Sequence, residues 1–421
     1  MFNTTEIAKG VNVYTRKTDQ FKTVNFSIKF KKELLKEDTA LRTVLTNVLQ
    51  HSNEQFKTAA EMRMYLDDLY GTVLYLDTTK KGNEYITLLN VETVNDHFLK
   101  DADVLNKVLE LMHTVLFNPN FTDGLFQSTI VEREKAMVID RIQSVFDEKS
   151  RYAQVKLQQL FRPNHPASTG VNGTVELVEA ITPEALKQAY EELLANDFID
   201  IFVVGDIDED EMVRSLKKYL PFTDRKDEYK KVAVEDTTPV TDYRKEQVEM
   251  RQAKLHIGYK APVRFNDEEF FTMQIFNGIF GGYPHAKLFT NVREKESLAY
   301  YCGSSYSSQY GVMYVTSGIE AENEEKALRL IDEQLEAIQN GEITDLELIQ
   351  TKAMLKNQLT EALDSARGQI EIYDQYRELP IPFTIAALSE KWDAVTKEDV
   401  AAVAKKVQRE TVFFLTGTEE V

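Results

Sequence analysis

Alternating hydrophobic and polar positions mark a strand near the start of the chain and a similar one past its middle. Residues 24–30 alternate as a half-buried strand does, and residues 255–259 repeat the pattern. Each segment precedes apolar residues that recur every three or four positions, which predicts an amphipathic helix. The helical positions are Leu41, Val44, Leu45, Val48 and Leu49 in the first half and Phe270, Phe271, Ile275 and Ile279 in the second.

The two halves also end alike. Thr182 and Thr396 are suited to cap helices, because a threonine hydroxyl accepts a hydrogen bond from a free amide of the first turn. Each predicted helix leads to an apolar strand and then to a glycine, Gly205 or Gly417, at similar distances from the threonine. A period of roughly 200 residues indicates a duplicated domain and not a solenoid of short repeats.

The order of the predicted elements favours an α+β fold. Strands occur in runs and helices in runs, without the glycine fingerprint of a dinucleotide-binding fold, so we expect two homologous domains. Each should be a mostly antiparallel sheet packed with helices. A charged stretch with Thr237-Thr238-Pro239 separates the halves. We therefore expect an N-terminal domain over residues 1–222, a linker over 223–245 and a C-terminal domain over 246–421.

Charge and composition narrow the classes of partner. The 421-residue chain has a formal net charge of -19, which repels nucleic acid and anionic lipid but suits a basic peptide. No basic segment followed by an apolar one opens the sequence, and no apolar run approaches the length of a membrane span. We expect a cytoplasmic protein with no nucleic-acid or membrane partner. The single cysteine, Cys302, lies in an apolar run and is interpreted as a core thiol.

A polar patch on the first predicted helix holds the candidate chemistry of the N-terminal half. Asn47, Gln50 and His51 form an Asn-x-x-Gln-His motif. Residues four apart share one helix face, so Asn47 and His51 can point toward the same ligand. An asparagine amide is a poor zinc ligand, and Gln50 cannot accept a proton at neutral pH. Taken alone, the motif is no more than a polar patch on a helix.

A longer ordered run marks the C-terminal half. Residues 278–289 read Gly-Ile-Phe-Gly-Gly-Tyr-Pro-His-Ala-Lys-Leu-Phe, and residues 291–300 read Asn-Val-Arg-Glu-Lys-Glu-Ser-Leu-Ala-Tyr. We expect a glycine-rich loop here, in which Gly281 and Gly282 permit close approach of another backbone, such as an extended peptide. Arg293 and Tyr300 carry a guanidinium and a phenol, both good donors toward a developing negative oxygen. A phosphate-binding loop is disfavoured, because no Lys-Ser/Thr pair follows the glycines.

Together these features resemble the M16 family of insulinase-like and pitrilysin-like metallopeptidases over nearly the whole chain. In that family the first helix carries His-x-x-Glu-His, with two zinc ligands and a general base, at the positions of Asn47, Gln50 and His51. The third ligand, a glutamate on a later helix, aligns with Arg141, which cannot bind a metal. The family's arginine and tyrosine, which reach the zinc site from the second domain and stabilise the oxyanion, match Arg293 and Tyr300.

The resemblance implies a bacterial M16B-type subunit that lacks the zinc motif. Some M16 peptidases pair a chain that keeps His-x-x-Glu-His with one that keeps the arginine and tyrosine. It implies that this chain binds peptide substrate, binds no cofactor itself, and is active only in a heterodimer whose partner supplies zinc. The isolated chain could also form a homodimer. Proteins of this inactive type are linked to modification of elongation factor P, for which the sequence offers no mechanism.

Two other interpretations stay open. The chain could be a catalytically inactive pseudoenzyme that binds peptides or acts as a scaffold, although retention of both Arg293 and Tyr300 favours the peptidase. It could also be an active metallopeptidase that uses His51 with Glu54 or Asp140, which would be a weak zinc site. The remaining histidines show no metal-ligand spacing and are expected to be surface or satisfied core residues: His97, His113, His165, His256 and His285.

Overall fold

The computed structural model describes residues 2–100 and 103–418. The chain forms two compact units, each assembled from more than one segment. Unit 1 comprises Met1–Gln143, Thr169–Ala233 and Ala362–Asp374, and unit 2 comprises Ser144–Ser168, Val234–Glu361 and Gln375–Val421. Each unit therefore contains a segment from the other half of the sequence, which the pattern of apolar residues did not predict.

Unit 1 is built on a six-stranded sheet in the order β1-β2-β8-β3-β5-β4. The long strand β3 pairs antiparallel with β5 from Thr23↔Val94 to Glu33↔Glu84, and with β8 on its other side. Only β2 and β8 run parallel among the described pairs of this sheet. The strands are β1 (Asn3–Ala8), β2 (Val11–Lys17), β3 (Thr23–Glu33), β4 (Val73–Lys81), β5 (Glu84–Val94) and β8 (Phe198–Gly205).

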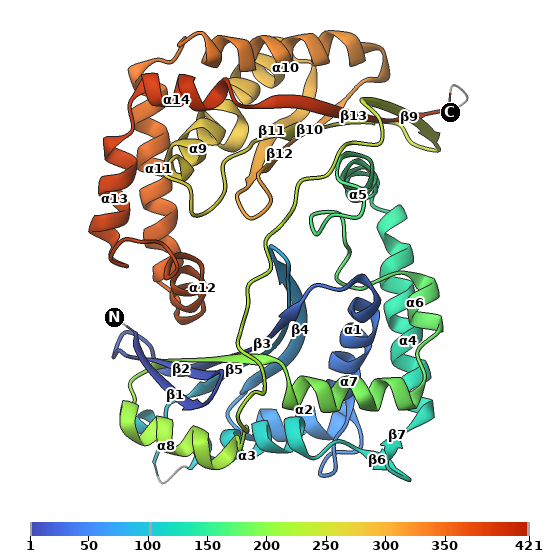
Figure 1. Cartoon of the computed structure of the whole chain (residues 1–421), viewed down its shortest axis with the longest axis vertical. Helices are drawn as coiled ribbons and strands as arrows, with labels where there is room; N and C mark the ends of the chain where they lie inside the picture. The colour runs from blue at the N-terminus through green and yellow to red at the C-terminus, as the bar shows by residue number, and fades with distance from the viewer. Residues whose placement is uncertain (1, 101–102, 419–421) are drawn as a thin grey trace. The chain divides into compact units, whose positions relative to one another are not determined.

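Helices cover one face of this sheet (Figure 1). The apolar side of α1 is buried in the main core of the unit, because its leucines and valines recur at helical spacing. A small β6-β7 hairpin (Phe121–Thr122 and Leu125–Phe126) lies apart from the sheet. The helices are α1 (Lys36–His51), α2 (Ala59–Asp68), η1 (Asp96–Phe98), α3 (Val104–Phe117), α4 (Ser128–Gln143), α6 (Val175–Glu179), α7 (Pro183–Ala195) and α8 (Glu209–Tyr219).

The opposite face of the same sheet is covered by α12 (Ala366–Tyr376), which comes from the C-terminal half. The Tyr373 ring stacks on Phe2 with ring centroids 4.2 Å apart. The buried ammonium of Lys29 lies 3.0 Å from a carboxylate oxygen of Glu371 and 3.0 Å from one of Asp374. Aromatic packing and a buried ion pair thus fix α12 to unit 1.

Unit 2 repeats the plan on a five-stranded sheet in the order β11-β12-β10-β13-β9 (Figure 1). All its pairs are antiparallel except β13 with β9. Its strands are β9 (Tyr243–Val248), β10 (Ala253–Lys260), β11 (Ala299–Ser307), β12 (Val312–Ile319) and β13 (Gln408–Gly417). Its helices are η2 (Ser144–Phe146), α5 (Lys149–Phe161), α9 (Phe270–Asn277), η3 (Gly278–Gly282), η4 (Leu288–Lys295), η5 (Ala321–Asn323), α10 (Glu324–Gln339), α11 (Asp345–Leu363), α13 (Ile385–Ala394) and α14 (Lys397–Ala404).

The helix α5 belongs to this unit although it lies in the first half of the sequence. Its buried residues Ala153, Leu157 and Phe161 lie on the face of α5 that packs on β10 and β13. A Cβ added to Gly258 of β10 would lie 2.7 Å from the Phe161 ring, so the glycine makes room for that ring. Unit 2 thus receives a helix from the N-terminal half, as unit 1 receives α12.

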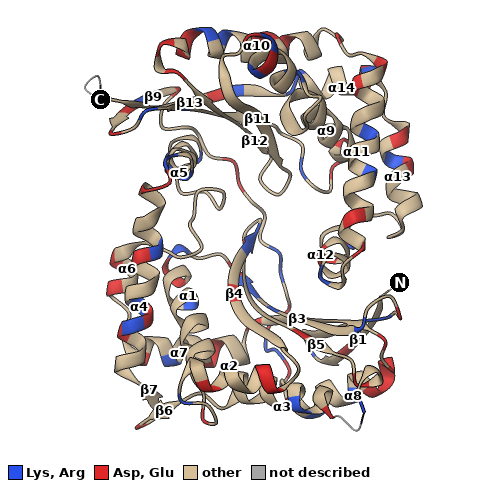
Figure 2. Cartoon of the chain, turned by 180° about the vertical axis from the view of Figure 1, so that it is seen from behind, with Lys and Arg blue, Asp and Glu red and all other residues tan. Residues whose placement is uncertain are grey.

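The expected α+β fold with two sheet regions is confirmed. Thr182 accepts a hydrogen bond from the Ala185 amide at the start of α7, and Thr396 forms a capping box with Asp399 at the start of α14. Acidic and basic residues are interspersed on exposed helices such as α10 and α13 (Figure 2). Among the described helices, none is long and apolar enough to cross a membrane.

Candidate functional site

The Asn-x-x-Gln-His motif lies in the last two turns of α1. His51 is the final residue of the helix, and its Nδ1 lies 3.2 Å from Oε1 of Glu134 on α4. Both side chains are largely buried, with 12% and 6% of their surface exposed. Burial raises the pKa of the Glu134 carboxyl, and the nearby His51, Arg133 and Arg141 partly oppose that effect. The histidine is therefore held by a buried carboxylate of the same unit.

The other two motif residues do not assemble a catalytic group. Gln50, at the position of the family's general base, accepts a hydrogen bond of 2.8 Å from the backbone amide of Leu76 on β4. Asn47 is half-buried one turn earlier on α1. An amide side chain cannot take up a proton at neutral pH, so Gln50 serves here as a structural acceptor.

The residues present do not fit the zinc ion that the fold family implies. A structural or catalytic zinc site needs at least three good ligands from histidine, cysteine or carboxylate side chains. Arg141, at the aligned third-ligand position, is exposed and permanently charged. Glu54 accepts a hydrogen bond from Asn118, and Asp140 is exposed. Within residues 2–100 and 103–418, no three His, Cys, Asp or Glu side chains are grouped to hold a metal.

Glu134 is the residue of this region that the sequence analysis did not assign. It lies seven residues, or two helical turns, before Arg141, so both lie on the same side of α4. This spacing from the aligned third-ligand position is the feature of the sequence that could have predicted a role for Glu134 beside His51. The contact between His51 and Glu134 explains why both can be buried, because a carboxylate removed from water needs a partner.

In unit 2 the glycine-rich segment is helical, so the expectation of a loop there was wrong. The α-helix α9 continues directly into the π-helix η3, and η4, which carries Arg293, is a second π-helix. The π-helix is rare and occurs often at functional sites, because the wider turn displaces side chains from their regular positions. Sequence periodicity near 3.6 cannot distinguish such turns from an ordinary helix.

The glycines are explained by close packing inside unit 2. A Cβ on Gly281 would lie 2.6 Å from the Ser304 backbone nitrogen of β11. The neighbouring Gly282 is exposed, and a Cβ there would meet the Asn277 side-chain amide at 2.9 Å. The backbone that approaches Gly281 is therefore a strand of the protein itself. The glycines hold η3 against β11, which carries Tyr300.

Arg293 and Tyr300 are both exposed. The Arg293 guanidinium lies 4.4 Å from the centroid of the Phe289 ring on the same helix. On β11 the register with β12 shifts between Ala299 and Tyr301, so Tyr300 occupies a β-bulge. Bulges change the direction of a side chain and are frequent beside active sites. Sequence analysis found both residues, but the bulge depends on strand pairing.

The tyrosine hydroxyl is held by a residue that the sequence analysis did not single out. The Tyr300 hydroxyl donates a hydrogen bond of 2.7 Å to the Glu320 carboxylate, which raises the pKa of the phenol. Tyr300 thus remains a neutral hydrogen-bond donor at physiological pH. An exposed guanidinium and an exposed phenol can together stabilise negative charge on a peptide carbonyl oxygen.

One histidine differs from the expectation. His256 of β10 is buried, and neither of its ring nitrogens has a hydrogen-bond partner among the described residues. The expectation that it would be exposed or satisfied was therefore wrong. Burial and the nearby Lys254 charge lower the pKa of its imidazole to about 3, so it is neutral. Cys302 is buried as expected, and burial raises the pKa of its thiol to about 12.

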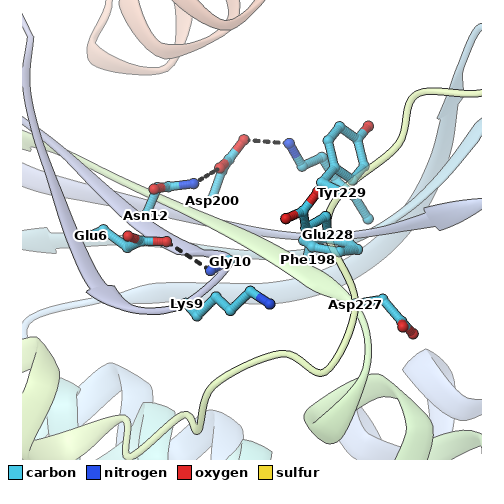
Figure 3. Close-up of a pocket in the computed structure, with 10 residues that line it drawn as sticks. Glu6, Lys9, Gly10, Asn12, Phe198, Asp200, Asp227, Glu228 and Tyr229 are labelled. Atoms are coloured by element: carbon cyan, nitrogen blue, oxygen red, sulfur yellow. Dashed lines mark hydrogen bonds and ion pairs between the residues drawn. The ribbon is translucent and has the colours of Figure 1, made fainter.

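A separate cavity of about 270 Å³ lies in unit 1 (Figure 3). Its charged groups are partly satisfied within the unit: Lys31 Nζ lies 2.6 Å from Asp200 Oδ2, and Glu6 accepts a hydrogen bond from the Gly10 amide. Phe198 contributes an aromatic wall. None of the site residues expected from the sequence lines this cavity, so it is distinct from both regions described above.

Comparison with known proteins identifies the family of this chain. A family model described as the peptidase M16 inactive domain matches residues 180–355. The probable inactive metalloprotease YmfF of Bacillus subtilis is 36% identical over 97% of this chain and 96% of its own length. A conserved protein from Enterococcus faecalis V583 has a crystal structure with a TM-score of 0.91, 34% identity, and coverage of 100% and 99% of the two chains.

A more distant relative is named as a zinc protease. The uncharacterised zinc protease YmxG of Bacillus subtilis is 24% identical over 63% of each chain. The likeness to an inactive metalloprotease extends over nearly the whole chain, and the motif residues here do not form a zinc site. The chain belongs to the M16 peptidase family and is one of its inactive-type, zinc-protease-like homologues.

Proposed function

We propose that this chain is the non-metal, substrate-binding subunit of a two-chain M16 zinc peptidase, and that Arg293 and Tyr300 act in the active site of the assembled complex. The observation that carries the proposal is the exposure of this pair. Both donors project from irregular backbone, one on a π-helix and one at a β-bulge. Neither side chain is buried in the core of unit 2, so Arg293 can contact a substrate directly, and Tyr300 can do so when its hydroxyl turns from Glu320 to the substrate.

The two side chains have complementary roles in this proposal. The guanidinium of Arg293 carries a permanent positive charge and up to five donors, which suits the carbonyl oxygen of a bound peptide as it becomes negative. The Tyr300 phenol adds a neutral donor, because its hydrogen bond to Glu320 favours the protonated form. Zinc and the general base belong to the partner, an M16 chain that carries His-x-x-Glu-His.

The test is peptide hydrolysis by this chain reconstituted with such a partner. Arg293→Ala or Tyr300→Phe should lower kcat by about 100-fold, the usual effect of removing one oxyanion donor, while the zinc content stays unchanged. Tyr243→Phe is the matched control, since that exposed hydroxyl also donates to a glutamate, Glu324. Full turnover in both site variants, or hydrolysis by this chain alone with bound zinc, would refute the proposal.

A peptide-binding scaffold is the second candidate. It is favoured by Gln50, because a side chain that cannot act as a base is fixed to the Leu76 amide. On this hypothesis Arg293→Ala weakens peptide binding by the chain and leaves turnover absent in every assembly. Purification of the tagged chain with its natural partners separates the two: co-purification of a His-x-x-Glu-His protein supports the peptidase subunit.

A further inference from the structure

The cavity in unit 1 has three walls (Figure 3). One wall is the β1-β2 hairpin, the second is formed by β3 and β8, and the third is residues 227–229, which come after α8. The volume of about 270 Å³ is below the roughly 300 to 1,000 Å³ of pockets for drug-sized ligands. The cavity therefore suits a ligand about the size of one amino-acid side chain.

The third wall is fastened to the unit by the buried side chain of Arg225. Its Nε donates a hydrogen bond of 2.6 Å to the Asp197 carbonyl, just before β8. Gly10 of the hairpin lies so close to this side chain that an added Cβ would be 2.9 Å from Arg225 Cγ. On the same segment, the Tyr229 ring meets Phe198 of β8 edge-on, with ring centroids 4.8 Å apart. Tertiary contacts therefore hold the third wall in place.

The charged residues that line the cavity leave an excess of negative charge. Lys31 Nζ lies 2.6 Å from Asp200 Oδ2, so these two groups neutralise each other. The other charged residues of the lining are three acids and one base: Glu6, Asp227, Glu228 and Lys9. In Figure 3 the Glu228 carboxylate points toward the hairpin wall, whereas the Asp227 side chain points away from it. Because the whole chain is also acidic, a cation is the favoured ligand, with Glu228 as its counter-ion.

The same walls already hold one ammonium group beside an acid and an aromatic ring. Lys31 Nζ, which is bonded to Asp200, also lies 4.8 Å from the centroid of the Tyr229 ring. A carboxylate and the face of an aromatic ring both attract a cation. Phe198 and Glu228 offer a ligand the same combination, and the Phe198 ring can also pack against methylene groups, as lysine stems do on apolar surfaces. An aliphatic ammonium therefore fits both the charge and the apolar surface of the cavity.

We propose that this cavity binds an aliphatic primary ammonium, carried either by a lysine side chain of another molecule or by a free diamine. Glu228 is the counter-ion, and Phe198 and Tyr229 pack against the methylene chain. Lys9 opposes binding, because its own charge lowers the excess of negative charge in the lining. All of these residues belong to unit 1, so the site does not depend on the proposed subunit function.

The test is calorimetric titration of the full-length chain with Nα-acetyl-lysine amide and with the diamine cadaverine. Nα-acetyl-norleucine amide is the matched control ligand, because it keeps the aliphatic chain and lacks the ammonium. The lysine derivative should bind about three-fold more tightly than the norleucine derivative, the effect of one exposed ion pair. Binding of cadaverine without this preference would identify a free diamine as the ligand. Absence of the preference together with no binding of cadaverine would overturn the proposal.

Three variants sharpen the test. Glu228→Gln should abolish the preference for the ammonium ligand, whereas Lys9→Met should strengthen its binding about two-fold, because a competing positive charge is removed. Weaker binding by Lys9→Met would indicate an anionic or zwitterionic ligand and would overturn the proposal, as would an unchanged preference in Glu228→Gln. Asp68→Asn, which changes an exposed carboxylate at the end of α2, is the matched control and should leave each affinity unchanged.

Discussion

The two regions that match the M16 family differ in what their polar side chains contact. In unit 1, His51 is paired with buried Glu134, and Gln50 is bonded to the Leu76 amide. In unit 2, Arg293 and Tyr300 are exposed, and 61% of the surface of Tyr300 is accessible to solvent. The first region has become part of the internal hydrogen-bonding of the fold, whereas the second presents its donors to solvent.

This difference separates structural from functional explanations. Polar groups shielded from water are usually hydrogen-bonded, because desolvation without a partner is costly, so the partial burial of Gln50 and His51 is enough to explain their bonds. Exposed groups carry no such requirement. The fold therefore explains His51 and Gln50 without any activity, but it gives no comparable reason for an arginine and a tyrosine on a π-helix and a bulge.

The largest expected effect is a loss of stability at Gly281, where η3 packs against the strand that carries Tyr300. Gly281→Val should destabilise the protein by about 3 kcal/mol, because the added atoms would overlap the Ser304 backbone. Urea unfolding measures the change. Gly282→Ala is the control, since its Cβ would lie 2.9 Å from the Asn277 side-chain amide, which can move, and no nearer than 3.1 Å to a backbone atom. Equal stability of the two variants would show that η3 is not packed tightly against β11.

The buried histidine of unit 2 gives a pH-dependent test. Because the folded-state pKa of His256 is about 3 and the unfolded value is near 6.5, the unfolded chain binds the proton first as pH falls. As the pH falls from 8 to 5, His256 should therefore lower the free energy of unfolding by about 2 kcal/mol. His256→Leu should remove this loss. Urea midpoints at both pH values measure it.

The pairing in unit 1 predicts an effect of intermediate size. His51→Leu should destabilise the protein by about 1 to 2 kcal/mol, because Glu134 is left buried with fewer partners. Adding Glu134→Gln should recover part of that loss by removing the charge. Thermal unfolding of the single and double variants measures the coupling. Strictly additive effects would contradict the view that His51 and Glu134 stabilise each other.

The smallest effect on stability is expected at the exposed tyrosine. Tyr300→Phe should leave the unfolding midpoint unchanged, since its hydroxyl bonds to Glu320 at the surface. The same result is expected for Tyr243→Phe. A large loss of stability for Tyr300→Phe alone would mean that the residue is structural, and it would weaken the comparison between the two regions.

Much of the fold could be read from local patterns. The strands β3 and β10 and the caps at Thr182 and Thr396 are short-range features and lie where expected. The expectation of half-buried strands was wrong, because residues 24–30 and 255–259 are buried on both faces of their sheets. The positions of the candidate residues within their helices and strands could also be predicted from the sequence, apart from the glycine-rich segment. There the sequence indicated a loop, because glycine weakens an ordinary helix, whereas tertiary packing against β11 stabilises a π-helix.

The sequence by itself determined the α+β class, the repeated plan and the loss of the zinc ligands, because these depend on periodicity, capping and residue chemistry. Only the tertiary structure decided that α5 and α12 pack with the sheets of the opposite halves, that His51 meets Glu134, and that Gln50 caps the edge of β4. These contacts join residues far apart in the chain. Their partners are selected by packing and by the need to satisfy buried polar groups, which no local pattern records.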